Sequence, residues 1–150
     1  MNPTHPLPEH HKHCDDLFAQ AEASFREQRP SDGRKLFGRF QAEMLAHFAA
    51  EEEVLFPQFE RATGMTAGPT QMMRLEHAQM RALLAAMASA AKAGDTAGFA
   101  GNAETLLILM QQHNMKEENI LYPMCDRALA GTDLAIADEL RARAAAACSA

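Results

Sequence analysis

Apolar residues recur every three or four positions along four long stretches of the chain, which is the spacing of one face of an α-helix. No stretch shows the strict alternation of apolar and polar residues that is typical of strands. Clusters of glycine and proline separate the stretches. We therefore expect four long helices and a shorter last helix, at about residues 8–28, 34–63, 70–93, 97–130 and 134–147.

Short connections between these helices determine how they are arranged. The segment Pro30-Ser31-Asp32-Gly33 is expected to end the first helix, and Gly94-Asp95 the third. Thr132 or Asp133 is expected to cap the last one. Because short connections make neighbouring helices antiparallel, the pattern predicts an all-α fold, an up-down-up-down four-helix bundle with a short extra C-terminal helix. We expect a single domain over residues 1–150, with the core bundle at about 7–130.

Composition and charge narrow the classes of function. Hydrophobic residues make up 47% and charged residues 23% of the chain, as in globular proteins. The net charge of -6 argues against nucleic acid or an anionic membrane as a partner. No apolar run approaches the roughly 20 residues that span a bilayer, and the first residues lack the apolar region of a signal peptide. We therefore expect a cytoplasmic protein, and no protein partner is indicated.

The sulfur-containing residues support this view. Three cysteines without a CxxC motif are typical of a reduced compartment. Cys14 and Cys125 are predicted to lie on the order of 20 Å apart along the bundle, too far for a disulfide. Cys148, near the C-terminus, is expected to couple chains only as an artefact. The abundant methionines are interpreted as core filler.

Five polar residues interrupt the apolar faces of the predicted helices. His47 and Glu51 are four residues apart, as are His113 and Glu117, so each pair projects within about 40° of arc. His77 lies on the apolar face of its own helix. A lone buried histidine is ordinarily a hydrogen-bonded core residue, but two neighbouring buried carboxylates repel each other unless a cation lies between them. The set therefore predicts a pair of metal ions.

An internal repeat extends this set of residues. The segment His47–Pro57 is echoed by His113–Pro123, and each residue lies 66 positions after its counterpart. The position 66 residues before His77 is His11, so the repeat selects His11 among the N-terminal histidines, with His10 as the alternative. Counting from the two hairpin turns places all the selected side chains at about one level of the bundle. The remaining N-terminal histidines are expected to be solvated: His5 and His13.

These elements together resemble a hemerythrin-type HHE domain over about residues 7–130. The resemblance is carried by His11, HFAAEEEVLFP at 47–57, EHAQM at 76–80 and HNMKEENILYP at 113–123. It implies two non-haem iron ions bridged by two carboxylates and by an oxo or hydroxo group. The implied ligands are His11 and His47 on one ion, His77 and His113 on the other, and Glu51 and Glu117 as bridges, with Glu118 as the alternative bridge.

The sequence departs from the oxygen-carrying members of this family at one position. Those proteins have a second histidine four residues after the first on the third helix, where this chain has Arg81. Arginine cannot bind a metal, so Arg81 either hydrogen-bonds a bridging carboxylate or pairs with Asp15, and we expect the pair. Tyr122 is expected to be a poor ligand, because nine residues after His113 is about 180° around an α-helix. Glu52, Glu53 and, unless it bridges, Glu118 are interpreted as a solvated acidic face.

The predicted site favours three functions. The first is a di-iron protein that binds or senses a small oxidant, namely dioxygen, nitric oxide or peroxide; whether it turns such a molecule over is open. The second is iron handling, either storage or delivery to damaged iron-sulfur clusters. The third is a structural bundle that binds zinc incidentally. Pro57 and Pro123, each ten residues after a histidine, are expected to kink their helices beyond the site.

Overall fold

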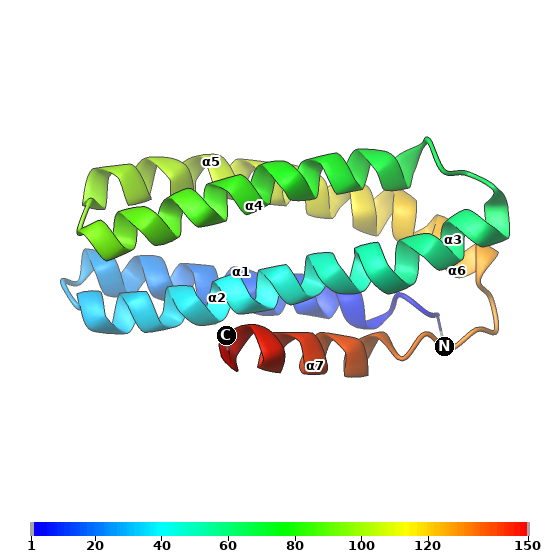
Figure 1. The fold of residues 1–150 in the computed structure, drawn as a ribbon, viewed down its shortest axis with the longest axis horizontal. Coiled ribbons are helices and arrows are strands. Elements are labelled where there is room, and N and C mark those ends of the chain that lie inside the picture. The colour runs from blue at the N-terminus through cyan, green and yellow to red at the C-terminus, as the bar shows by residue number, and fades with distance from the viewer. Residues whose placement is uncertain (1, 150) are drawn as a thin grey trace.

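The computed structural model describes residues 2–149, without the side chains of 148 and 149, and this part of the chain contains helices and no strand (Figure 1). The four long helices are α1 (Pro6–Arg26), α2 (Pro30–Ala50), α4 (Pro69–Ala93) and α5 (Thr96–Lys116). The shorter elements are η1 (Glu51–Leu55), α3 (Phe56–Thr63), η2 (Glu117–Leu121), α6 (Tyr122–Ala128) and α7 (Ile136–Ser149). The predicted all-α bundle with an extra C-terminal helix is therefore confirmed. No helix in the described part is long and apolar enough to cross a membrane.

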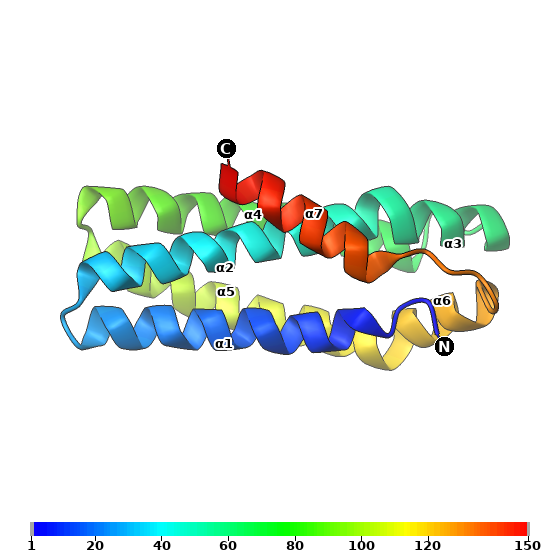
Figure 2. The ribbon, with the colours of Figure 1, turned by 90° about the horizontal axis from the view of Figure 1, so that it is seen from below.

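The two hairpins pack against each other, and the last helix covers one of them. Figures 1 and 2 show α1 beside α2, α4 beside α5, and α7 along the outer side of the α1–α2 pair. Helix α7 buries Ile136, Leu140 and Ala144, which lie four residues apart on one face. Within residues 2–149, no helix covers the opposite outer face, which is formed by α4 and α5. Large apolar side chains are exposed on its side of the bundle: Met72, Leu75, Ile108, Met115 and Ile120.

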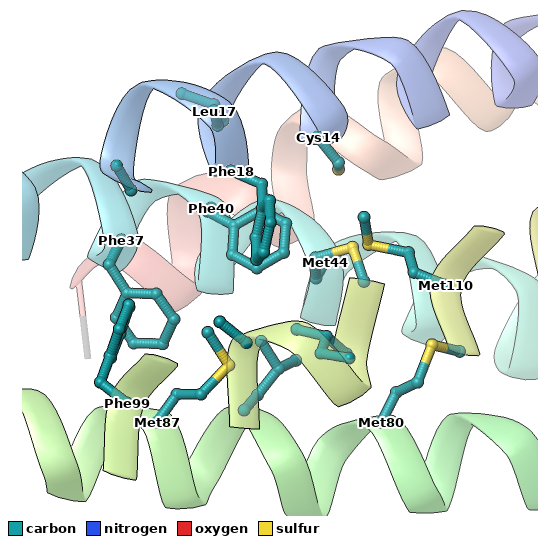
Figure 3. Close-up of a cluster of buried hydrophobic side chains, with 14 of the residues drawn as sticks. Cys14, Leu17, Phe18, Phe37, Phe40, Met44, Met80, Met87, Phe99 and Met110 are labelled. Atoms are coloured by element: carbon teal, nitrogen blue, oxygen red, sulfur yellow. The ribbon is translucent and has the colours of Figure 1, made fainter. Parts of the chain in front are cut away.

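The apolar core forms two clusters with the predicted metal site between them. The first cluster lies between the hairpin turns and the site, and Figure 3 shows its aromatic and methionine side chains. Met80, Met87 and Met110 are almost fully buried there, which agrees with the predicted role as core filler. The second cluster lies toward α3 and α6 and includes Leu55 and Cys125.

The first hairpin turn is tighter than predicted. Helix α2 begins at Pro30 rather than near residue 34, because proline at the first helical position has a suitable φ and needs no hydrogen-bond donor. Gly33 lies within the first turn, where a Cβ atom would come within 2.7 Å of the Phe25 ring. The chain reverses at Gln28 instead, whose φ of 59° is left-handed, and the Arg29 N–H donates to the Ser24 carbonyl at 2.8 Å.

The start of the last helix also differs from the prediction. Helix α7 begins at Ile136, so neither Thr132 nor Asp133 caps it. The Asp133 carboxylate instead accepts a hydrogen bond from the Ala135 backbone N–H at 2.9 Å, which makes a local turn before the helix.

The repeat suggests a test of how much the left-handed conformation of Gln28 costs in stability. Gly94 occupies the counterpart of Gln28 and has a φ of 72°. Since a left-handed conformation costs about 1–2 kcal/mol for a residue with a Cβ atom, we expect Gln28→Gly to raise the free energy of unfolding by about 1 kcal/mol. Chemical denaturation measures this change. The control is Gln20→Gly on the exposed interior of α1, which should lower stability by about 1 kcal/mol.

Two π-helical turns interrupt long helical segments of the bundle: η1 lies between α2 and α3, and η2 lies between α5 and α6. The backbone N–H of Phe56 bonds to the carbonyl of Glu51, and that of Tyr122 to the carbonyl of Glu117, five residues earlier in each case. A proline follows directly in both halves. Each helix therefore widens by one residue just before the proline that was predicted to kink it. The wider turn changes the direction in which every later side chain points, relative to a continuous α-helix.

Both cysteines in the core are free and buried. Burial raises the pKa of the Cys125 thiol to about 12 and that of Cys14 further. Thiolates are the reactive form, so neither residue is a nucleophile at neutral pH. The side chain of Cys148 lies outside the described residues.

Candidate metal centre

The structure brings together all six side chains that the sequence selected. They come from each of the four rods and lie in the interior between the two apolar clusters. Glu51, His77 and Glu117 are 0% exposed, and the others at most 6%. Two overlapping groups have ligand atoms close enough to hold a metal ion: Glu51, His77, His113 and Glu117, and His11, His47 and Glu117.

Each of the two buried carboxylates reaches histidines on both sides of the centre. Glu51 places Oε2 at 3.4 Å from His47 Nε2 and Oε1 at 3.0 Å from His77 Nε2. Glu117 places Oε1 at 3.2 Å from the Nε2 atoms of both His11 and His113. Each carboxylate therefore lies between two histidines from different helices, Glu51 through both of its oxygens and Glu117 through Oε1 alone.

Three of the histidines are oriented by carboxylates behind them. The Nδ1 of His77 bonds to Glu52 at 2.7 Å, and that of His11 bonds to Glu118 at 2.6 Å. These two pairs occupy equivalent positions in the repeat. His113 Nδ1 bonds to Glu76 at 2.8 Å. We assign the Nδ1–H form to all three, because a carboxylate can only accept; the Nε2 lone pair then points into the centre.

The fourth histidine has a different partner. His47 Nδ1 lies 2.8 Å from His10 Nδ1, and His10 Nε2 lies 2.8 Å from Glu43. Since His10 donates to Glu43 through Nε2, its Nδ1 accepts from His47, whose Nε2 lone pair therefore also points inward. Burial, and next the nearby His47, lower the pKa of His10 to about 4, which keeps it neutral. His10, the alternative to His11, thus lies behind the predicted ligands and not among them.

Several inward-facing atoms of the centre have no hydrogen bond. They are Glu51 Oε1, His77 Nε2, His113 Nε2 and Glu117 Oε2. Buried polar atoms are normally paired, since an unpaired one costs roughly 1–3 kcal/mol. When the lone pairs of imidazole nitrogens and carboxylate oxygens point at one another, they repel unless a cation or a proton lies between them. The donor set, nitrogen with oxygen, suits iron.

The charges of the centre are consistent with a cation. Burial would lower the pKa of His77, but Glu51 and Glu52 outweigh it and raise that pKa to about 9. Burial would raise the pKa of Glu51, but His47 and His77 hold it well below its ordinary value. Without a metal, His77 is therefore expected to carry a proton on Nε2 in the place of the cation, and metal binding releases that proton.

Arg81 has another partner than the one predicted. Its two terminal nitrogens donate to the two oxygens of Glu52, each at 2.9 Å, and it does not pair with Asp15. The repeat relates Asp15 on α1 to Arg81 on α4, but α4 packs against α5 and α2. Arg81 therefore orients the carboxylate that holds His77.

The acidic face is only partly solvated. The Glu52 side chain is 19% exposed, which corrects the prediction that it is solvated, because its carboxylate is held between His77 and Arg81. Glu53 is 59% exposed and pairs with Arg143 at 3.0 Å. Glu118 is 39% exposed and points toward His11 Nδ1 from behind, whereas Glu117 is 0% exposed. The geometry therefore favours Glu117 over Glu118 as the bridge.

Tyr122 lies in the centre, which corrects the expectation that it points away. Its hydroxyl donates to Glu51 Oε2 at 2.5 Å and lies 3.0 Å from Glu117 Oε1. The π turn at 117–121 adds one residue to the turn, which rotates Tyr122 by about 100° relative to an uninterrupted α-helix. The proline at position 123 was the available signal for this change. Burial, followed by the charges of Glu117 and Glu51, raises the pKa of Tyr122 well above its ordinary value.

A helical bundle whose four rods direct buried histidines and glutamates to one point is a metal-binding four-helix protein. The chain belongs to the hemerythrin HHE cation-binding domain family, whose family model matches residues 2–125. Searches among curated proteins and among solved structures found no match to the chain. The predicted family is therefore confirmed by the family model.

Proposed function

We propose that this chain is a non-haem di-iron protein that binds a small oxidant: dioxygen, nitric oxide or peroxide. In this proposal His11 and His47 bind one iron, and His77 and His113 bind the other. Glu51 and Glu117 bridge the two ions, and an oxo or hydroxo group completes the bridge. The observation that carries the proposal is the pair of fully buried carboxylates, each lying between imidazole nitrogens from two helices.

The role of the protein is to hold the donors in place before any metal arrives. Each Nδ1 proton has an acceptor behind it, so each ring is fixed with Nε2 inward. The acceptors are themselves held, since Arg81 binds Glu52 and Lys116 pairs with Glu76. A preorganised set of ligands of this kind lowers the cost of assembling the site.

The surroundings favour a small, uncharged ligand. Bound iron with imidazole and carboxylate donors and an open position supplies a place for dioxygen or nitric oxide to bind. Phe48 and Phe56 stack on the His77 ring, at 4.3 and 5.9 Å between centroids, and keep bulk water away from that side. A groove of about 30 Å³ beside Glu76 and Met80 has room for about one water-sized molecule. A cavity of about 380 Å³ lies at the hairpin turns, around Phe25 and Phe99, away from the site, and an open hollow of about 460 Å³ borders His10 on the outer side of α1.

Iron content and spectra of the purified protein test this proposal. Protein from iron-replete cells is expected to contain about two iron ions per chain and to show the absorption of an oxo-bridged pair in air. Nitric oxide added to the reduced protein should change the spectrum reversibly. Iron that leaves readily to a chelator, without a response to oxidant or nitric oxide, would instead support iron handling. Zinc in place of iron would contradict both.

A further inference from the structure

The Tyr122 hydroxyl is surrounded by side-chain atoms from one half of the centre. Its Oη lies 3.3 Å from His11 Nε2, 3.2 Å from His47 Nε2, 3.0 Å from Glu117 Oε1 and 2.5 Å from Glu51 Oε2. All four atoms belong to the proposed ligands of the iron on the α1–α2 side. The residue is fully enclosed, at 2% exposure, and it is the single tyrosine of the chain.

Three of these distances, at 3.0 to 3.3 Å, match the spacing of neighbouring ligands around one metal ion. The 2.5 Å contact with Glu51 is the hydrogen bond that the phenol donates in the metal-free centre. When bonds from an octahedral ion to nitrogen or oxygen are about 2.1 Å, adjacent donors lie about 3.0 Å apart. The phenol oxygen is therefore spaced from His11, His47 and Glu117 so that it could bind the same ion as they would. Tyrosine oxygen is an established ligand of protein-bound iron in other folds.

The other half of the centre has no such oxygen. The repeat places Phe56 at the counterpart of Tyr122, and its ring stacks on His77 with 16° between the planes. The phenylalanine side chain has no oxygen that could bind a metal. Among the hydrogen bonds of the described residues, the Tyr122 hydroxyl has none to His77 or His113. Among the polar atoms that face the centre, the two halves differ at this one.

We propose that Tyr122 Oη is a fifth protein ligand of the iron at His11 and His47. The inference rests on the di-iron site proposed above and deepens it. On binding, the oxygen–hydrogen bond of the phenol breaks, the proton passes to solvent, and the oxygen pair forms the bond to the ion. The iron at His77 and His113 then keeps the open position, so the small ligand binds on the side walled by Phe48 and Phe56.

Spectra of the iron(III)-loaded full chain test this assignment. Iron(III) phenolate gives a visible charge-transfer band and enhanced tyrosine ring modes in resonance Raman spectra. With a single tyrosine in the chain, both signals must come from Tyr122. The proteins compared are the wild type, Tyr122→Phe, which copies the residue of the other half, and Phe56→Leu as the matched change that removes no oxygen.

The expected result is a phenolate signal in the wild type and in Phe56→Leu, and its complete loss in Tyr122→Phe. Tyr122→Phe should also bind its weaker iron about 10-fold or more less tightly, as counted by iron titration. A wild type that holds two iron ions without any phenolate signal would overturn this assignment and leave the di-iron proposal intact. A wild type that binds no iron would overturn both.

Discussion

Replacing Glu51 by glutamine is expected to abolish the two-iron centre while the bundle stays folded. Glu51 is the residue whose two oxygens face histidines on opposite sides, at 3.4 and 3.0 Å. Glutamine keeps the volume but has one acceptor oxygen and an NH₂ group that cannot bind a metal, so the bridge is lost. We expect iron affinity to fall by more than about 100-fold, beyond the loss typical of residues behind the ligands.

Iron per chain and the absorption of the oxo-bridged pair measure this effect, and circular dichroism reports whether the helices remain. The matched control is Glu53→Gln, two residues later in the same π turn, where the side chain is 59% exposed. The control should keep the wild-type iron content. An oxo-bridged spectrum that survives Glu51→Gln would show that this residue is not a bridge.

The second large effect separates two adjacent histidines of α1. His11→Ala should remove a ligand, so that the variant holds at most about one iron per chain. His10→Ala should leave all ligands present and remove only the acceptor behind His47, which lies 2.8 Å away. For a residue in that position we expect about a 10- to 100-fold weaker affinity, with both ions still bound at saturating iron.

Iron titrations of the two variants, run side by side with the wild type, check this ranking. Both substitutions remove the same side chain one residue apart, so each serves as the control for the other. A greater loss of iron in His10→Ala than in His11→Ala would mean that α1 presents its histidines differently from the structure.

The periodicity and the repeat were enough to predict most of the fold and the composition of the site. Apolar spacing predicted the four rods because each helix must bury one face. The offset of 66 residues selected His11, because both halves of the bundle present equivalent positions to the same interior. Helix ends were less predictable: Pro30 begins a helix, and Gln28 adopts a conformation that glycine usually supplies.

Contacts between side chains of different helices could not be predicted in this way. The pairing of Arg81 with Glu52 depends on which rods are neighbours, and the repeat relates residues by symmetry without saying that they touch. The partners behind His47 and His113 differ, His10 in one half and Glu76 in the other, although their positions are equivalent.

The sequence by itself therefore determined the bundle and the six side chains that meet in its interior, since these follow from spacing along regular helices, and its motifs indicated the family. Only the tertiary structure decided which atoms lie behind each of these side chains and that the Tyr122 hydroxyl lies among them. The physical reason for the position of Tyr122 is the π turn, which changes the direction in which the side chains after it point. A rule of 100° per residue holds only while the helix keeps its α-helical hydrogen bonds, and at 117–121 it does not.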